Sequence, residues 1–204
     1  MRAMLGVFTV LASAAVLTGC SGVVMLNPAH TPETVFEDAG LAGTWKLDSD
    51  DIYVVLAREA DAWRVEVYGE KDDGKATEER YFFSGHLFRL DKQVYLDAVM
   101  TGSHAGTLKE VMGDTDGLVL ATHYVARVER DGDTLVLYTL DGAWVAEQAA
   151  AGKVPLTVVP VPEKDKWWLV TDGTDKVQDF LRSVAETPEA WGPAKLVRQA
   201  PPKE

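Results

Sequence analysis

The sequence predicts a mainly β fold: one antiparallel barrel or half-barrel of about eight strands, with one short helix and a C-terminal amphipathic helix. Short apolar runs alternate with polar residues at the two-residue period of half-buried strands, most clearly in residues 62–70. Turn clusters such as Asp72-Asp73-Gly74 separate these runs. A helical period appears at residues 175–185, and a start signal at Asp141 with a stop at Gly152 predicts one short helix near residues 142–151. Many short strands with few helices indicate a barrel or a sandwich of strands.

An apolar leader precedes the strands. Residues 1–19 hold one cationic residue, Arg2, followed by a mostly apolar run without acidic side chains, which is typical of a secretory signal peptide. A transmembrane anchor is the alternative, but such a helix needs about 20 apolar residues. The polar Asn27-Pro28 follows too soon for that. We therefore expect residues 1–19 to be a signal peptide.

The leader ends at Leu17-Thr18-Gly19-Cys20, which resembles the lipobox of bacterial lipoproteins. The resemblance implies that Cys20 becomes the mature N-terminus and carries a diacylglyceryl thioether and an N-acyl chain such as palmitate. Two or more acyl chains anchor a protein stably in a membrane. Ser21, rather than Asp, follows the cysteine, which in such lipoproteins indicates the outer membrane, facing the periplasm. The membrane is thus the first expected partner.

Cleavage would leave 185 of the 204 residues, a length that suits one domain. We expect residues 20–40, which contain two prolines and lack a sustained period, to be a lipidated tether with one docking contact at Val35-Phe36. Residues 41–199 are expected to form the single barrel domain. Residues 200–204 are expected to be a disordered tail.

The composition excludes two features. The net charge of −12 disfavours binding to phosphate backbones, so nucleic acid is not an expected partner. Cys20 is the only cysteine, so the chain has no internal disulfide and its stability must come from burial and hydrogen bonds.

Local signals predict how several elements begin and end. Gly85 interrupts the aromatic run 79–90 and predicts a kinked strand or two short strands. Asp131-Gly132 predicts a hairpin with a type I′ turn. Asp141 is the expected N-cap of the first helix, and Asp175 that of the second. The remaining strands are expected at residues 41–47, 52–57, 93–100, 118–130, 133–140, 167–170 and 194–198, with an edge segment at 154–161.

Gly43-Thr44-Trp45, which opens the strands, resembles the Gly-x-Trp signature of lipocalins, fatty-acid-binding proteins and avidin. In that group the tryptophan plugs the closed end of a barrel and a basic residue from a late strand packs over it. Arg127, Arg130 and Arg198 are the candidate counterparts, and the sequence does not choose among them.

A wider resemblance is to uncharacterised bacterial lipoproteins with a small lipocalin-like barrel and a C-terminal helix. It names an architecture and no activity. The segments that carry it are residues 86–90, 140–145, 169–171 and 177–181.

No catalytic or metal-ligating motif stands out, so we expect no enzyme, no metal and no cofactor. The four histidines are at least 18 residues apart, without the paired spacing of zinc ligands. His123 falls in phase with Arg127 and is expected on the solvent face. Asp114-Thr115-Asp116-Gly117 imitates a calcium loop, but Val125 stands where the loop requires glutamate.

Aromatic side chains remain as the candidate functional residues. A small barrel of about eight strands holds either a packed core or one small ligand. The first hypothesis is a lipid-anchored envelope protein that binds a small apolar ligand in the barrel mouth. The alternative is a structural or interaction lipoprotein with a filled barrel that binds an envelope protein, through its acidic face or Trp167-Trp168. The predicted ligand-binding residues are Trp45, Trp63, Tyr81, Phe83 and Tyr124.

Overall fold

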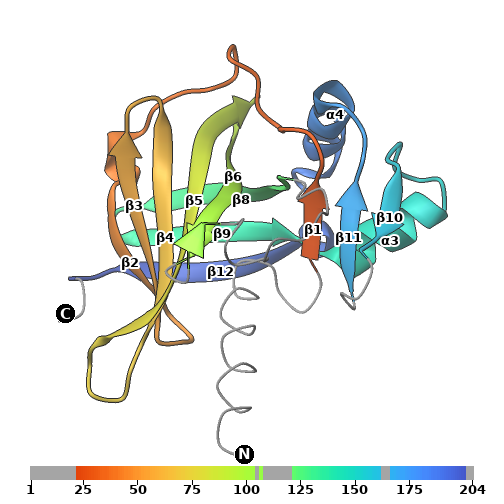
Figure 1. The fold of residues 1–204 in the computed structure, drawn as a ribbon. Coiled ribbons are helices and arrows are strands. Elements are labelled where there is room, and N and C mark those ends of the chain that lie inside the picture. The colour runs from red at the N-terminus through yellow and green to blue at the C-terminus, as the bar shows by residue number, and fades with distance from the viewer. Residues whose placement is uncertain (1–21, 104–105, 108–120, 162–165, 201–204) are drawn as a thin grey trace, which may run out of the picture.

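A closed barrel forms the body of the molecule (Figure 1). The computed structural model describes residues 22–103, 106–107, 121–161 and 166–200 of the chain. Within these ranges eight antiparallel strands close on themselves and two α-helices pack beside them, which confirms the predicted fold class. The leader, Cys20, the loop at 114–117 and residues 201–204 lie outside the described residues.

The barrel strands follow one another antiparallel in the order β8-β9-β12-β2-β3-β4-β5-β6. Pairing of Val94 to Val99 in β6 with Val128 to His123 in β8 closes the ring. The two-residue strand β7 (Gly106–Thr107) pairs with the end of β6. The eight strands are β2 (Gly43–Leu47), β3 (Ile52–Glu59), β4 (Ala62–Glu70), β5 (Ala76–Leu90), β6 (Gln93–Ser103), β8 (His123–Asp131), β9 (Thr134–Leu140) and β12 (Trp191–Arg198).

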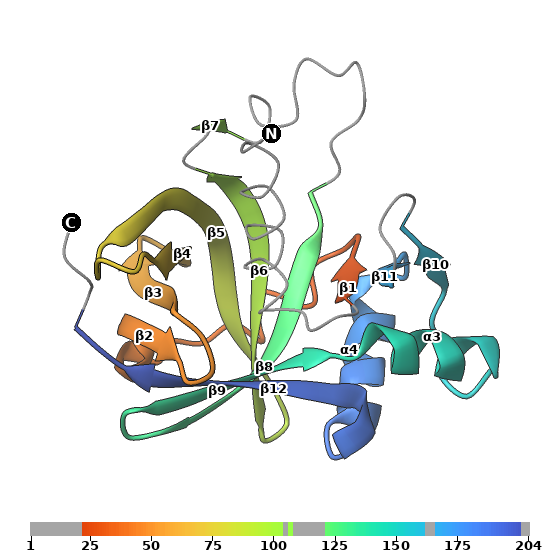
Figure 2. The ribbon, with the colours of Figure 1, turned by 90° about the horizontal axis from the view of Figure 1, so that it is seen from below.

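Three further strands extend the same sheet beside one end of the barrel, and we call them the small sheet (Figure 2). Its central strand β11 (Trp167–Val170) pairs parallel with β1 (Gly22–Met25) and antiparallel with the edge strand β10 (Val158–Pro160). Met25 also pairs with His123, which joins this sheet to the barrel. Pro160 lies on the outer edge, as expected for a residue that cannot donate to a neighbouring strand.

Residues 22–40 of the segment predicted as a tether are instead part of the folded domain. All four residues of β1 are buried, and a 3-10 helix at Ala39–Leu41 leads directly into β2. The sequence did not reveal this strand because β1 has only four residues, too few to show an alternating pattern, and its pairing partner is distant in the chain. The contact predicted at Val35-Phe36 is confirmed: Val35 bridges to Phe88, and Phe36 packs against the barrel core.

Both helices form where the sequence predicted them, the first from its capping signals and the second from its helical period. Helix α3 (Gly142–Ala150) begins at Asp141, whose side chain accepts a hydrogen bond from the Trp144 N–H at 2.9 Å, as predicted. The prediction of Asp175 as N-cap is wrong: helix α4 (Thr174–Val184) has Gly173 as its N-cap, two residues earlier, and no side chain caps it. Gln178, in the middle of this helix, is buried and donates a hydrogen bond to the carbonyl of Ala29 at 2.9 Å.

Two local predictions are refined. Strand β5 is one strand from Ala76 to Leu90 rather than two, and its irregularity lies between Phe82 and Phe83 rather than at Gly85, which allows close packing. A Cβ on Gly85 would lie 3.0 Å from Leu96. The predicted β8–β9 hairpin is present, but its two-residue loop is Gly132-Asp133, and only Gly132 has a positive φ, of 55°. That pattern fits a type II′ turn.

The apolar side chains form two clusters, one on each side of the barrel wall. The inner cluster fills the barrel and includes Trp45 and Trp63, both almost fully buried. The outer cluster packs α4 and the small sheet against the outside of β5, β6 and β8, around Phe88, Tyr95 and Phe180. The two clusters meet at the barrel end beside β1, where the candidate site lies.

Candidate functional site

One end of the barrel is sealed by a tryptophan. Trp45 is fully buried and its indole N–H donates to the carbonyl of Leu41 at 3.0 Å. The guanidinium of Arg198 lies 4.2 Å from the Trp45 ring centre and donates to the carbonyls of Ala42 and Gly40, each at 2.9 Å. Gly43 is required here because its φ is 146° and a Cβ would overlap the Arg198 guanidinium.

The structure thus selects Arg198 from the three candidate arginines. Arg127 lies outside the barrel, between the rings of Tyr138 and Trp191, and donates to the carbonyl of Ala185. Arg130 is 3.6 Å from the carboxylate of Asp38. A cation over a tryptophan face contributes electrostatic attraction in addition to its packing.

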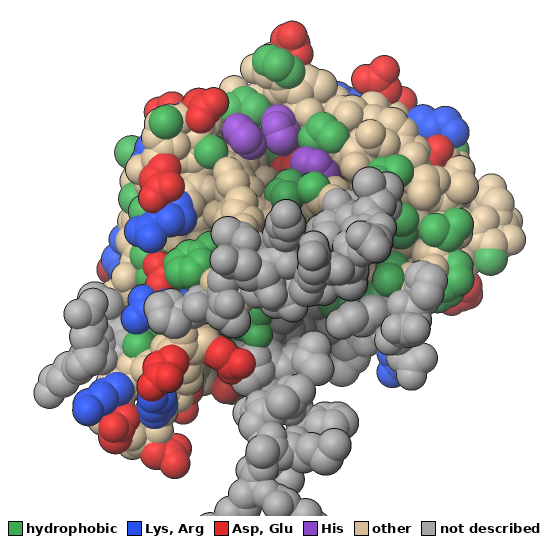
Figure 3. Space-filling model, viewed as in Figure 1, with side chains coloured by type: hydrophobic (Ala, Val, Ile, Leu, Met, Phe, Trp, Pro, Cys, Tyr) green, Lys and Arg blue, Asp and Glu red, His purple; other side chains and the backbone are tan. Residues whose placement is uncertain are grey.

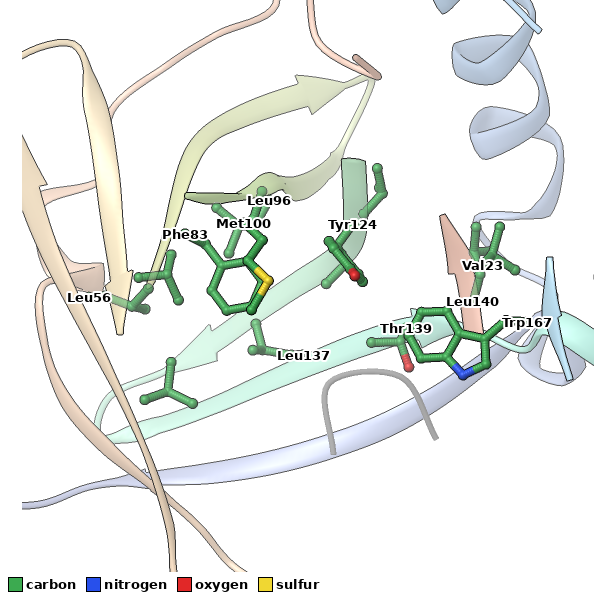
Figure 4. A pocket seen from close by; sticks show the side chains of 15 residues that line it. Val23, Leu56, Phe83, Leu96, Met100, Tyr124, Leu137, Thr139, Leu140 and Trp167 are labelled. Atoms are coloured by element: carbon green, nitrogen blue, oxygen red, sulfur yellow. The ribbon is translucent and has the colours of Figure 1, made fainter. Parts of the chain in front are cut away.

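The opposite end of the barrel holds an apolar pocket with a cavity of about 90 Å³ (Figure 4). It runs from Leu56 and Phe83 inside the barrel, past Tyr124, to Val23 and Trp167 of the small sheet. Polar atoms reach its wall mainly through Tyr124 and Thr139. The lining residues are Val23, Val54, Leu56, Val65, Phe83, Leu96, Ala98, Met100, Tyr124, Val125, Ala126, Leu137, Thr139, Leu140 and Trp167.

Three aromatic rings follow one another along this pocket. Phe83 and Tyr124 meet edge to face with ring centres 5.9 Å apart, and Tyr124 meets Trp167 in the same way at 6.2 Å. Edge-to-face pairs are a favourable arrangement of aromatic rings. Burial raises the pKa of the Tyr124 hydroxyl. The pocket wall is therefore uncharged at neutral pH.

Only two of the five residues predicted to bind ligand line the pocket. Phe83 and Tyr124 do. Trp45 and Trp63 belong to the filled interior, and Tyr81 packs beside that interior without reaching the pocket. Trp45 and Trp63 fill the interior toward the sealed end and stabilise the fold. Tyr81 pairs with Ser103, beyond the pocket-lining pair of Phe83 and Met100, and stays outside the pocket.

The residues that shape the mouth of the pocket, Val23 and Trp167, were not predicted from the sequence. Val23 lay in the expected tether, and Trp167 was considered only as a protein-binding surface. Their contribution depends on the parallel pairing of β1 with β11, which joins residues more than 140 positions apart. One signal was available: Leu96, Ala98 and Met100 alternate along β6, and all three line the pocket.

The cavity volume limits what the pocket can hold. Sites for drug-sized ligands measure about 300–1,000 Å³, and an apolar cavity of about 150 Å³ accepts benzene. At about 90 Å³, the pocket accommodates the end of an apolar chain and leaves the rest of the chain outside.

Outside the barrel wall, one buried carboxylate binds two histidines. Asp97 is fully buried and accepts hydrogen bonds from the Nδ1 atoms of His30 and His123 and from the Ala29 N–H, all at 2.8 Å. His86 stacks on His30 with ring centres 4.4 Å apart, and Figure 3 shows these histidines as one group. The prediction that His123 faces solvent is therefore wrong, because the outer face of β8 is covered here.

The Asp97 cluster joins three separate parts of the chain. Burial alone would raise the pKa of Asp97, but hydrogen bonds from His123, His30 and Ala29 outweigh it and lower the pKa to about 2. Burial, and next the neighbouring His30, lower the pKa of His86. Because an ionised carboxylate only accepts hydrogen bonds, both Nδ1 atoms must carry their protons. The cluster fastens the segment around His30 to the barrel wall.

The described ranges lack two features, a group of metal-ligating side chains and a long apolar helix. There, no three His, Cys, Asp or Glu side chains are grouped so that they could hold a metal ion. No helix in the same ranges has the length and apolar character needed to cross a membrane. Comparison of the chain with protein-family models, with curated proteins and with solved structures finds no match.

Proposed function

We propose that this chain is a lipid-anchored envelope protein whose barrel holds the end of an apolar chain in its open mouth. The observation that carries the proposal is the uncharged pocket of about 90 Å³ between the barrel and β1. The sealed end agrees with the resemblance to lipocalins, because Trp45 and Arg198 take the positions that the resemblance implies. That resemblance supports the proposal but does not identify a ligand.

The anchoring half of the proposal rests on the lipobox resemblance at Cys20. After signal cleavage, acylated Cys20 holds the protein on the outer membrane, facing the periplasm. Mass spectrometry of the protein isolated from its native envelope tests this half alone. The expected N-terminal peptide begins at Cys20 and carries three acyl chains. A free thiol at Cys20 contradicts anchoring and leaves the pocket proposal standing.

Titration of the mature chain with palmitate tests the pocket half. A Cys20→Ser chain starting at residue 20 contains every described residue and carries no lipid. We expect saturable binding, followed through aromatic fluorescence, since Trp167 and Tyr124 line the mouth. Absence of saturation with palmitate and with a neutral fluorescent apolar probe contradicts the proposal.

A matched pair of substitutions locates the binding. Ala98→Leu adds three carbon atoms to the pocket wall and is expected to weaken palmitate binding at least tenfold, or about 1.4 kcal/mol. Ala57→Leu adds the same atoms on β3, outside the pocket lining, and is expected to leave binding unchanged. Equal effects of the two substitutions contradict this site.

The filled interior supports a second candidate, an interaction lipoprotein that binds an envelope protein. Trp167 and Trp168 are both half-buried and adjacent on β11, so the small sheet presents aromatic surface. Trp168→Ser should then weaken capture of one envelope protein by the immobilised mature domain, without changing palmitate binding. Failure to recover the same partner repeatedly from envelope extracts argues against this candidate.

A further inference from the structure

Cys20, the proposed lipidation site, is only three residues before Val23, which lines the pocket. Gly22 is the first residue of β1 and pairs with Trp167, and a Cβ on Gly22 would lie 2.8 Å from the Trp167 ring. The next residue, Val23, lines the pocket together with Trp167. Only Ser21 separates Gly22 from Cys20, and two residues span at most about 7 Å. Lipid on Cys20 therefore starts near the rim of the pocket.

The dimensions of the pocket suit one chain end. Its cavity of about 90 Å³ is smaller than that of sites for whole ligands, and its wall is apolar. An acyl chain attached at the rim can enter with its terminal methylenes while its first carbons stay at the mouth. A ligand wider than an acyl chain would not enter the cavity, and a more polar ligand would bring polar atoms against Leu96 and Met100.

Attachment also favours this chain over free competitors. A group held by a short flexible link experiences an effective concentration of about millimolar at a site within its reach. A free fatty acid at micromolar concentration then competes poorly for the same cavity. We infer that the occupant of the pocket is an acyl chain carried by Cys20 of the same molecule. This inference rests on the proposed lipidation and on the proposed pocket.

The single cysteine permits a direct test with the mature chain. One sample carries on the Cys20 sulfur a hexadecyl chain that ends in a photoreactive diazirine, and its matched control carries an ethyl group. After irradiation in dilute solution, we expect crosslinks to pocket residues such as Leu96, Met100 and Tyr124. Mixing with an isotope-labelled S-ethyl protein shows whether each crosslink lies within one molecule. Palmitate should bind the S-hexadecyl protein at least tenfold more weakly than the S-ethyl protein.

A second arm separates the protein's own chain from bilayer lipid. The S-ethyl protein is irradiated with vesicles of phosphatidylethanolamine and phosphatidylglycerol whose acyl chains carry the diazirine. We expect few crosslinks in the pocket from these lipids, and fewer still after Ala98→Leu. Crosslinks from vesicle lipid that equal or exceed those from Cys20 would overturn the inference and make a bilayer lipid the occupant.

The remaining outcomes distinguish this inference from the proposed function. If neither arm gives crosslinks in the pocket, the inference about Cys20 is wrong. If the S-ethyl protein still binds palmitate in that case, the pocket function stands. If the S-ethyl protein does not bind palmitate either, both the inference about Cys20 and the proposed pocket function are wrong. Crosslinks only between labelled and unlabelled molecules would also overturn the inference, because the acyl chain would then occupy a second copy's pocket.

Discussion

The two ends of the barrel pack their aromatic side chains in different ways, and only the open end borrows residues from strands outside the barrel. At the sealed end Trp45 is fully buried, its N–H is bonded to Leu41, and Arg198 covers its face. At the open end Trp167 and Tyr124 are half-buried around a cavity. Tryptophan content alone therefore does not locate a binding site. Trp45, which is packed on all sides, stabilises the barrel, whereas Trp167, which borders a cavity, shapes the pocket.

The N-terminal segment contributes to both ends. Its strand β1 borders the pocket, while Leu41 at its other end packs against the core around Trp45 and accepts the indole hydrogen bond. Between them, Ala29 and His30 are fastened to Asp97 on the outer wall. The segment therefore couples the rim of the open end to the seal of the closed end.

The largest expected effect separates the two ends by stability. Trp45→Ala should lower the free energy of unfolding by about 3–5 kcal/mol, because it leaves a large cavity in a packed interior. Trp167→Ala should lower it by about 1 kcal/mol, since that ring is already half-buried beside a cavity. Urea denaturation followed by circular dichroism measures both. Equal losses would show that the open end is packed as the sealed end is.

The next effect concerns the attachment of the N-terminal segment. Asp97→Asn should lower the free energy of unfolding by about 2 kcal/mol at pH 7, because the buried carboxylate accepts three hydrogen bonds. Asp91→Asn, at an exposed carboxylate 3.8 Å from Arg182, is the matched control and should change it by less than about 0.5 kcal/mol.

The pH dependence gives this prediction a second readout. The pKa of Asp97 is about 2 in the folded protein, below its ordinary value of 3.8. Its ionised form therefore stabilises the fold above the ordinary pKa, and this stabilisation is lost as the pH falls toward 2. The stability difference between the wild type and Asp97→Asn should shrink over that interval. A difference that stays constant from pH 7 to pH 2 would contradict the assignment.

The smallest effect tests the choice of arginine at the sealed end. Arg198→Met should lower the free energy of unfolding by about 1 kcal/mol, because it removes the cation over Trp45 and two hydrogen bonds to carbonyls. Arg130→Met removes only a contact with Asp38 and should lower it by less than about 0.5 kcal/mol. Thermal unfolding measures both variants. A larger loss of stability for Arg130→Met than for Arg198→Met would show that Arg198 does not stabilise the sealed end.

The sequence was sufficient for elements whose signals are local. Alternation predicted the barrel strands, Asp141 predicted the start of α3, and the apolar face of residues 177–184 predicted α4. Gly43-Thr44-Trp45 predicted the sealed end, although the choice of Arg198 needed the pairing of β12 with β2. Each of these signals lies within about ten residues.

The pocket could not be predicted in the same way, because it depends on contacts between distant segments. Val23 reaches it through a parallel pairing with β11, and His123 is covered because Asp97, His30 and β1 meet on the outside of β8. Aromatic residues in alternating positions indicate an inward face but do not say where space remains. Trp63 and Phe83 share that face, and only Phe83 borders the cavity.

Methionine methyl groups provide the most direct test of the central claim, that the open end binds an apolar chain. Met100 lines the pocket, whereas Met25 is buried in the outer cluster and does not. Nuclear magnetic resonance of the mature Cys20→Ser chain labelled with 13C-methyl methionine follows both during titration with palmitate. We expect a saturable shift of the Met100 signal while the Met25 signal stays nearly unchanged. An unchanged Met100 signal, or equal shifts of Met100 and Met25, would contradict the central claim.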